Sequence, residues 1–267
     1  MPEQQSIWER ILAARAAGRV ADIDLHGLEP GEQLMVDALM PLALHRGRLA
    51  IAQLGQSLDG RIATESGDSW YINGPPARAH LHRLRALVDA VLIGAGTAAE
   101  DRPQLSVRHV SGSDPVPVIL DPRGRVQPRG PLFERPAAAL PVLHLVGADA
   151  DPAPAPSGVD RVRIAVGPDG ACPHQVLDLL AERGLKRVLV EGGGVTVSRF
   201  LAADALDYLH LLIAPLIIGS GRPGIRLEPI ERLAEARRPP MRSFPLGDEL
   251  LVELALGGRA ARASSAR

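Results

Sequence analysis

Two glycine-rich turns are the segments of this sequence most suited to chemistry. The first, Gly94–Thr97, follows the apolar run Val91–Ile93, and the second, Gly192–Gly194, follows Val188–Val190. Glycines just past a parallel strand let the backbone approach a ligand, and free N–H groups at the start of the next helix bind phosphate or ribose oxygens. The spacing is neither GxGxxG nor a P-loop. The two turns predict a site for a phosphorylated ligand at one edge of a sheet.

The second turn is the better phosphate cradle. Its helix carries Thr196, Ser198 and Arg199, so backbone amides, two hydroxyls and a guanidinium converge on one helix start. The structural alternative is a plain connection from strand to helix, with Glu191 as a charge near the helix N-terminus. Three consecutive glycines cost backbone entropy without a packing gain, which favours the functional interpretation.

The helix expected over Pro76–Leu87 places three basic side chains at i, i+4 and i+7 on one face, namely Arg78, His82 and Arg85. A solvated basic face is the usual explanation. Alternatively, Arg85 holds a substrate phosphate together with Arg108. His80 and His82 are expected at the surface rather than on a metal, because no cysteine or carboxylate lies at ligand spacing.

A polar turn, Ser57–Gly60, interrupts the apolar segment Ala52–Thr64. Such a turn marks either a hairpin tip or an edge that faces a ligand, and the sequence leaves both open.

Composition limits the class of protein. The 267 residues suit one main domain, and 46% hydrophobic with 23% charged residues is typical of a globular chain. A formal net charge of −1 gives no global attraction to nucleic acid or to an anionic membrane. The single Cys172 excludes an intrachain disulfide and fits a reducing compartment. No secretory signal and no spanning apolar run is recognisable, so we expect a cytoplasmic location.

The elements that must position the turns alternate between short branched apolar runs and helical stretches, which indicates βαβ units and a largely parallel sheet. We expect strands at Leu49–Leu54, Ala90–Ile93, Val116–Leu120, Val142–Val146, Val162–Val166 and Val188–Val190, and a partly antiparallel pair within Leu206–Ile218 and Leu250–Leu256. We expect helices at Ile7–Ala17, Glu32–Leu44, Pro76–Leu87, Pro173–Arg183 and Val195–Ala203, and an exposed loop at Asp149–Gly158.

Four motifs, read in order, resemble the reductase domain of bacterial riboflavin-biosynthesis enzymes, which belongs to the dihydrofolate-reductase-like group. They are SLDGRIA, the segment Ser69–Arg85, GAGTAAEDRPQLSVR and EGGG. The resemblance covers residues 48–257 and implies an α/β fold with a mixed, mostly parallel open sheet flanked by helices. Residues 1–47 are then an N-terminal helical appendage, and residues 258–267 are a flexible tail.

The resemblance implies a homodimeric enzyme that uses NADPH to reduce the ribosyl group of 5-amino-6-(5-phosphoribosylamino)uracil to a ribityl group. It assigns substrate contacts to Ser69, Arg85, Leu105, Arg108 and Glu191. It assigns dinucleotide contacts to Tyr71, Thr97, Asp101, Gly193, Gly194, Val195, Thr196, Val197, Ser198 and Arg199. Asp101 would move a proton at the opened sugar, Glu191 would recognise pyrimidine or amino donors, and Arg199 is the candidate for the 2′-phosphate of NADPH by its position. No metal is implied.

The sequence departs from this family in three places. Gln53 replaces the usual lysine, and Gln supplies neither a charge nor a comparable proton donor. Tyr71, beside Trp70, stands where the family often has tryptophan. The zinc deaminase that many bacterial members carry is expected to be absent, since its His/Cys/Cys cluster has no counterpart here.

Two other functions stay open. Gln53 favours a reductase of the same fold that acts on another pyrimidine or a pterin-like compound. A non-catalytic dinucleotide-binding protein is the alternative from another class. A pure binder has no use for the substrate-side residues Asp101, Arg85, Arg108 and Glu191, which argues against it.

Overall fold

The computed structural model describes residues 6–19, 27–70, 72–136 and 139–257. In chain order the helices are α1 (Ile7–Ala17), α2 (Pro30–Leu44), α3 (Pro75–Leu87), α4 (Ala95–Glu100), α5 (Pro173–Glu182) and α6 (Gly194–Ala202), with a 3-10 turn at Leu233–Glu235. The strands are β1 (Leu49–Ser57), β2 (Arg61–Thr64), β3 (Ala90–Gly94), β4 (Val116–Asp121), β5 (Val142–Gly147), β6 (Val159–Ile164), β7 (Arg187–Val190), β8 (Tyr208–Ala214), β9 (Gly221–Pro223), β10 (Met241–Leu246) and β11 (Glu249–Ala255).

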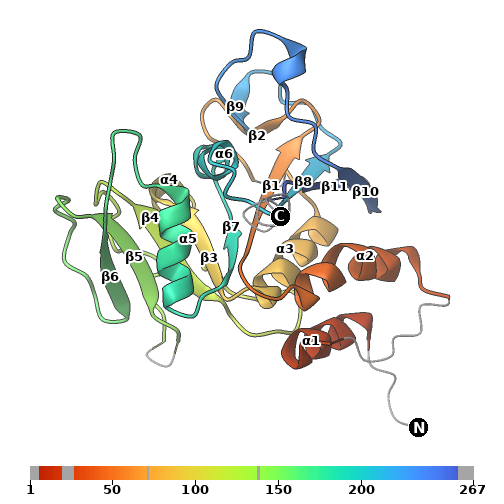
Figure 1. Ribbon diagram of the computed structural model, residues 1–267, viewed down its shortest axis with the longest axis horizontal. Coiled ribbons are helices and arrows are strands. Elements are labelled where there is room, and N and C mark those ends of the chain that lie inside the picture. The colour runs from red at the N-terminus through yellow and green to blue at the C-terminus, as the bar shows by residue number, and fades with distance from the viewer. Residues whose placement is uncertain (1–5, 20–26, 71, 137–138, 258–267) are drawn as a thin grey trace, which may run out of the picture.

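Nine strands form one sheet in the order β10-β11-β8-β1-β7-β3-β4-β5-β6. The seven strands from β8 to β6 run parallel, whereas β11 pairs antiparallel with β8, and β10 with β11. A separate hairpin-like pair, β2 and β9, lies beyond the carboxyl ends of β1 and β8 (Figure 1). The predicted α/β class with a mixed, mostly parallel sheet is confirmed.

Alternating side chains of the central strands build two apolar layers. In β1, Leu49 and Ile51 face the layer formed with α1, α2 and α3, while Ala52 and Leu54 face the layer formed with α5 and α6. This period-two pattern buries both faces of the parallel sheet, as its near-continuous apolar strands require.

The N-terminal helices share the core of the sheet. Ile11 of α1 and Leu39 of α2 are fully buried in the first apolar layer. Trp8 donates its indole N–H to the carbonyl of Ser111 at 2.8 Å. The C-terminal end of α1 is capped by Gly18 in the left-handed conformation, with φ of +65°, directly after the predicted helix Ile7–Ala17.

Most predicted elements lie within a few residues of the observed ones, and four strands differ. Strand β6 begins at Val159 and ends at Ile164 rather than covering Val162–Val166. The short strands β2, β9 and β10 were not predicted. The predicted tail at residues 258–267 lies outside the described residues.

The prediction that His80 and His82 lie at the surface is wrong, since their relative exposures are 0% and 3%. His80 Nε2 lies 2.9 Å from His210 Nδ1, and His210 Nε2 lies 3.2 Å from the Glu253 carboxylate. With His210 donating to Glu253, its Nδ1 accepts from His80, and His80 Nδ1 is left without a partner among the described residues. Burial, aided by His210 and Arg83, holds the pKa of His80 well below 6.5.

This buried histidine gives the fold a pH dependence. A histidine in the unfolded chain takes up a proton near pH 6.5, whereas folded His80 stays neutral, so stability is lost as pH falls below that point. The expected contribution of His80 to the slope is about 1.4 kcal/mol per pH unit at most. His80→Gln keeps a donor for His210 but cannot take up a proton. The free energy of unfolding should therefore fall less steeply with falling pH in this variant, as measured by urea unfolding between pH 7 and pH 5. Equal slopes for the variant and the wild type would contradict this.

Candidate active site

The site lies where the carboxyl ends of three adjacent strands meet. Because β7 lies between β1 and β3, the turns that follow β3 and β7 are brought side by side at the same edge. Residues almost 100 positions apart in the sequence therefore meet there, as the two glycine-rich turns predict.

A hydrogen bond locks the two turns together. The N–H of Gly193 donates to Thr97 Oγ1 at 2.9 Å. Gly192 has φ of +83°, and a Cβ on it would lie 2.7 Å from the Thr97 side chain. A Cβ on Gly94 would lie 2.3 Å from Thr196 Oγ1. Glycine suits both positions because the Thr97 and Thr196 side chains occupy the space that a Cβ would take.

Thr97→Val tests this lock. Valine keeps the shape of the side chain but leaves the Gly193 N–H without its acceptor, which costs about 1–3 kcal/mol when the group is partly buried. We expect NADPH to bind about tenfold more weakly, measured by fluorescence titration, because the start of α6 is no longer held. Ser243→Ala, which removes an exposed hydroxyl on β10, is the control and should bind NADPH as the wild type does. Unchanged NADPH affinity in Thr97→Val would show that the lock is unnecessary.

The predicted dinucleotide residues of α6 divide into two groups. Val195 is 74% exposed, and Thr196 and Arg199 are also accessible. Val197 is fully buried in the core, and Ser198 Oγ accepts the backbone N–H of Arg226 at 2.8 Å. The side chains of Val197 and Ser198 therefore anchor α6, and only their neighbours can meet a ligand.

The start of α6 is also approached by the segment after β9. A Cβ on Gly194 would lie 2.6 Å or less from the carbonyl oxygens of Pro223 and Gly224. On the far side of the helix, the Arg199 guanidinium lies against Gly170, in the loop between β6 and α5. Arg199 thus reaches toward that loop rather than toward the β3 turn.

Asp101 closes α4 and donates its N–H to the carbonyl of Thr97 at 3.0 Å. Removal of water around its carboxyl group, together with repulsion from Glu100, raises the pKa of Asp101, while Arg222 opposes the shift. Arg222 forms an ion pair with Glu100 at 2.7 Å. Glu100 and Arg222 do not follow from the sequence, because no local pattern links residues 122 positions apart.

Arg85 and Glu191 form a buried bidentate ion pair. Arg85 Nε and Nη2 each donate to a Glu191 carboxylate oxygen at 2.8 Å, and the two side chains are each only 7% exposed. Arg85 Nη1 donates to the carbonyl of Ser106 at 2.9 Å. The predicted solvated basic face is therefore wrong for Arg85. The substrate contacts predicted for Arg85 and Glu191 would require this pair to open.

The segment after α4 is held from several sides. Leu105 has φ of +56° and is only 1% exposed as a whole residue, so this left-handed turn places it in the apolar core. The N–H of Arg108 donates to His82 Nδ1 at 3.0 Å, and the Arg108 side chain is exposed and donates to Gln104. Burial beside Arg85 lowers the pKa of His82 to about 4, which keeps it a neutral acceptor at pH 7.

The Ser57–Gly60 turn has a structural role. Ser57 Oγ donates to Asp59 at 2.6 Å and accepts the N–H of Arg61 at 2.9 Å. Asp59 also accepts from Ile218 and Gly219, and these hydrogen bonds, with that of Ser57 the largest, lower the pKa of Asp59 to about 2. The turn is not a hairpin tip, because β1 and β2 belong to different sheets, and it ties the end of β1 to the loop after β8.

Gln53 is buried in β1 and pairs in register with His210 on β8. Ser69 is exposed in the loop after β2, and Tyr71 lies outside the described residues, so its predicted contact is a sequence-based expectation only. Within the described part of the chain, no three His, Cys, Asp or Glu side chains gather as a metal site would need. The described helices are all too short or too polar to cross a membrane.

The edge fits a dinucleotide. A Cβ on Gly96 would meet nothing within 4 Å, so the backbone of the first turn is open at that point. At the start of α6, the N–H groups of Gly194 and Val195 have no partner within the helix, whereas that of Thr196 donates to the Gly193 carbonyl at 3.0 Å. Thr97, Gly193 and the start of α6 would hold the phosphates, and Asp101 lies one helical turn from Thr97.

Comparisons with known proteins agree with this arrangement. The sequence model of the RibD C-terminal domain family matches residues 48–246. A relative from Methanothermobacter thermautotrophicus, named 2,5-diamino-6-ribosylamino-4(3H)-pyrimidinone 5′-phosphate reductase, is 32% identical over 78% of this chain and 98% of its own length. The riboflavin biosynthesis protein RibD of Bacillus amyloliquefaciens is 34% identical over 61% of this chain, which spans only 44% of that longer protein.

Solved structures show the same fold. The deaminase/5-amino-6-(5-phosphoribosylamino)uracil reductase of Thermotoga maritima superposes with a TM-score of 0.65 at 27% identity, covering 84% of this chain and 61% of that one. The riboflavin biosynthesis reductase of Saccharomyces cerevisiae gives a TM-score of 0.67 at 21% identity, which supports the fold alone. The family match over most of the sheet and the shared fold lead to one conclusion: this chain belongs to the RibD C-terminal domain family.

Proposed function

We propose that this chain is an NADPH-dependent reductase that converts the ribosyl group of 5-amino-6-(5-phosphoribosylamino)uracil into a ribityl group. The observation that carries the proposal is the lock between Thr97 and Gly193, with Asp101 beside it. This hydrogen bond brings together the two turns that would hold phosphates, and the carboxyl group of Asp101, whose pKa is raised, lies at the same edge of the sheet. The relatives named as reductases of phosphorylated ribosylaminopyrimidines support the same reaction.

Each part of the site has a role in this reaction. NADPH held at the two glycine-rich turns would supply a hydride to the sugar carbon that becomes the ribityl CH2 group. The raised pKa of Asp101 lets its carboxyl group hold the proton that moves when the sugar ring opens. The exposed Arg108 suits the substrate phosphate. The Arg85–Glu191 pair positions the segment at Ser106.

A second candidate substrate is the 2,5-diamino compound. Two relatives that this chain covers over 98% and 90% of their lengths carry the name of that reductase. Both pyrimidines have the same ribosylamino phosphate, so Asp101 and Arg108 serve either one. Another pyrimidine or a pterin-like compound is a further candidate substrate, because Gln53 lacks the positive charge of the lysine that the family usually has at this position.

The test is NADPH oxidation by the purified chain with each pyrimidine, alongside NADPH binding without substrate. Turnover with the uracil compound supports the proposal, and a higher kcat/KM for the diamino compound would replace the substrate. Tight NADPH binding without turnover on either pyrimidine would overturn the proposed substrate, and no NADPH binding would overturn the reductase activity.

We also propose a homodimer in the cytoplasm. Strand β10 is an edge strand of the nine-stranded sheet, paired with β11 on one side only. Its residue Met241 is 64% exposed. Edge strands with exposed apolar side chains are common sites of pairing. Light scattering should give twice the chain mass of 28.3 kDa. A mass of one chain would contradict the dimer.

A further inference from the structure

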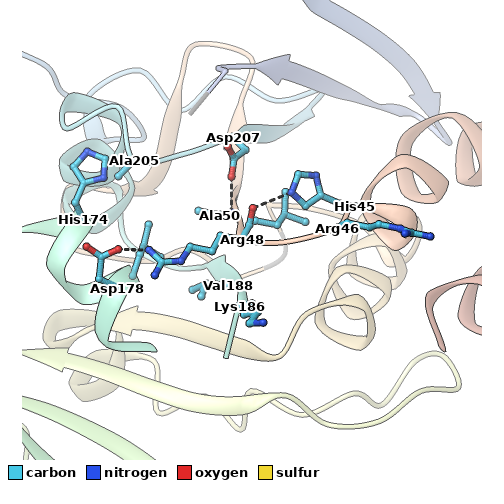
Figure 2. A pocket seen from close by; sticks show the side chains of 12 residues that line it. His45, Arg46, Arg48, Ala50, His174, Asp178, Lys186, Val188, Ala205 and Asp207 are labelled. Atoms are coloured by element: carbon cyan, nitrogen blue, oxygen red, sulfur yellow. Dashed lines mark hydrogen bonds and ion pairs between the residues drawn. The ribbon is translucent and has the colours of Figure 1, made fainter. Parts of the chain in front are cut away.

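A pocket of about 280 Å³ opens at the opposite end of the sheet from the glycine-rich turns. It lies where β1 and β7 begin, beside α5 and the turn between α6 and β8 (Figure 2). Its lining residues are His45, Arg46, Arg48, Leu49, Ala50, His174, Leu177, Asp178, Lys186, Val188, Ala205 and Asp207. The candidate active site uses none of them.

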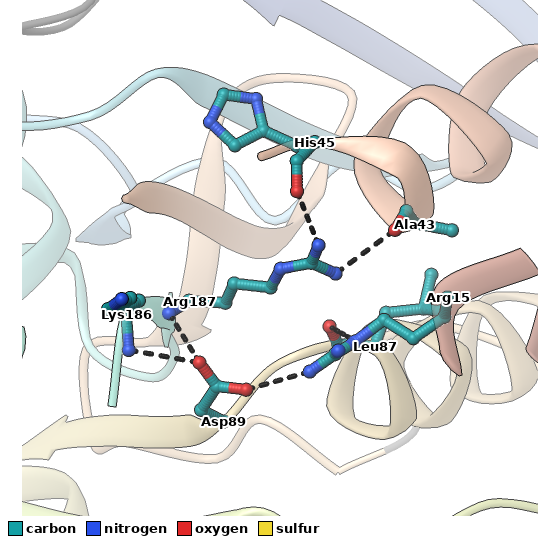
Figure 3. Close-up of polar contacts among 7 residues, drawn as sticks. All are labelled: Arg15, Ala43, His45, Leu87, Asp89, Lys186 and Arg187. Atoms are coloured by element: carbon teal, nitrogen blue, oxygen red, sulfur yellow. Dashed lines mark hydrogen bonds and ion pairs between the residues drawn. The ribbon is translucent and has the colours of Figure 1, made fainter. Parts of the chain in front are cut away.

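One wall of the pocket is the connection between α2 and β1, and hydrogen bonds from Arg187 fix its backbone. The Arg187 guanidinium donates to the carbonyl of Ala43 at 3.1 Å and to that of His45 (Figure 3). Asp89 accepts the backbone N–H groups of Lys186 and Arg187 at 2.9 and 2.8 Å, and it pairs with Arg15 at 2.7 Å. The main chain at both His45 and Lys186 is thus fixed before any ligand arrives.

The opposite wall is fixed in the same way. The Asp207 N–H donates to the carbonyl of Ala50 at 2.7 Å, and the Ala50 N–H donates to the Asp207 carboxylate at 2.8 Å. Burial raises the pKa of Asp207, and the hydrogen bond from Ala50 opposes the shift. A preformed cavity between fixed walls binds a small molecule without an ordering cost.

The charges of the pocket favour an anion. Both carboxylates are engaged, Asp207 with Ala50 and Asp178 with Arg48, whose side chain reaches across to α5 (Figure 2). The Lys186 ammonium has no ion-pair partner among the residues described, and Arg46 adds a second exposed cation at the rim. One end of the pocket therefore carries positive charge that the protein itself does not neutralise.

The floor is apolar. Three of its residues have a relative exposure of 6% or less, namely Leu49, Val188 and Ala205. Leu177 of α5 is partly buried beside them. Side chains of this kind accept a flat or branched hydrocarbon surface, while a few polar groups at the rim fix its orientation. A purely inorganic anion would leave this floor unused.

We propose that this pocket binds a small amphipathic organic anion, whose ring or hydrocarbon body rests on Leu177 and Val188 and whose sulfonate, phosphate or carboxylate meets Lys186. The site is separate from the proposed reductase chemistry and does not depend on it. A loss of one function in an experiment therefore leaves the other measurable.

The probe is 8-anilinonaphthalene-1-sulfonate, a planar anion whose fluorescence rises in apolar surroundings. It is titrated into the full chain with saturating NADP⁺, so that the dinucleotide site is filled. We expect saturable binding, weakened about tenfold by Lys186→Glu and retained by Lys186→Arg, because a charge reversal repels the sulfonate. Lys186 is exposed, so its variants should fold, which the thermal unfolding midpoint checks.

Two controls make the result specific. Arg183→Glu reverses an exposed charge near the end of α5 outside the pocket and should leave the affinity unchanged. The uncharged analogue N-phenyl-1-naphthylamine should bind wild type and Lys186→Glu alike. Equal affinity of the sulfonate for wild type and Lys186→Glu, its complete displacement by NADP⁺, or the absence of saturable binding would each overturn the proposal.

Discussion

Replacing Asp101 with Asn is expected to lower kcat by at least about 100-fold, because a positioned acid or base contributes about 10²–10⁴-fold to a proton transfer. Asparagine keeps the size of the side chain and the backbone bond to Thr97, but its amide cannot give up a proton in this way. NADPH should bind to the variant nearly as it does to the wild type. Steady-state oxidation of NADPH and a binding titration measure the two effects separately.

The neighbouring acid supplies the control. Glu100→Gln removes the repulsion that raises the pKa of Asp101 and frees Arg222, and both changes lower that pKa. If the protonated form of Asp101 acts, the loss of activity at rising pH should begin at lower pH in this variant, while the maximal kcat changes little. Wild-type turnover in Asp101→Asn would remove Asp101 from the mechanism.

Replacing Glu191 with Ala is expected to lower the free energy of unfolding by about 3–5 kcal/mol, the usual cost of leaving one member of a buried ion pair alone. Arg85 would keep its hydrogen bond to Ser106 but lose both bonds to the carboxylate at 93% side-chain burial. Urea unfolding at pH 7 measures the loss. The double variant Arg85→Met, Glu191→Leu should be far less destabilised, since it removes both charges.

A variant that retains the positive charge of Arg85 tests whether the Arg85–Glu191 pair stabilises the fold or binds the substrate. Arg85→Lys keeps one cation beside Glu191 but cannot make two parallel bonds and a third to Ser106. If the pair is structural, this variant should lose stability while its KM for the pyrimidine changes little. A large rise in KM at nearly unchanged stability would instead restore the direct substrate contact that the sequence implies.

The sequence predicts the fold well where local patterns are strong. Branched apolar runs mark β1, β3, β4, β5 and β7, and Gly18 marks the end of α1. The short strands β2 and β9 escape prediction because they have few apolar residues and are defined by their pairing with each other. Pairing between distant segments leaves no periodic signal in either one.

The site is predicted in its parts but not in its contacts. The two glycine-rich turns meet at one sheet edge as predicted, whereas the partners of Arg85 and His80 do not follow from the sequence. A helical stripe of basic residues looks the same whether it faces water or a buried carboxylate such as Glu191. Only the insertion of β7 beside β3 decides which of the two it faces.

The position of β7 also constrains how the protein is made. Strands β1 and β3 do not pair with each other, because β7 fills the space between them. A ribosome adding residues in order delivers β1, β3, β4, β5 and β6 before it delivers Arg187–Val190. Until then the nascent sheet consists of two parts with unpaired inner edges, which are open to wrong partners. The central strand arrives late, so the edge where the two glycine-rich turns meet is completed only when about seven tenths of the chain has been synthesised.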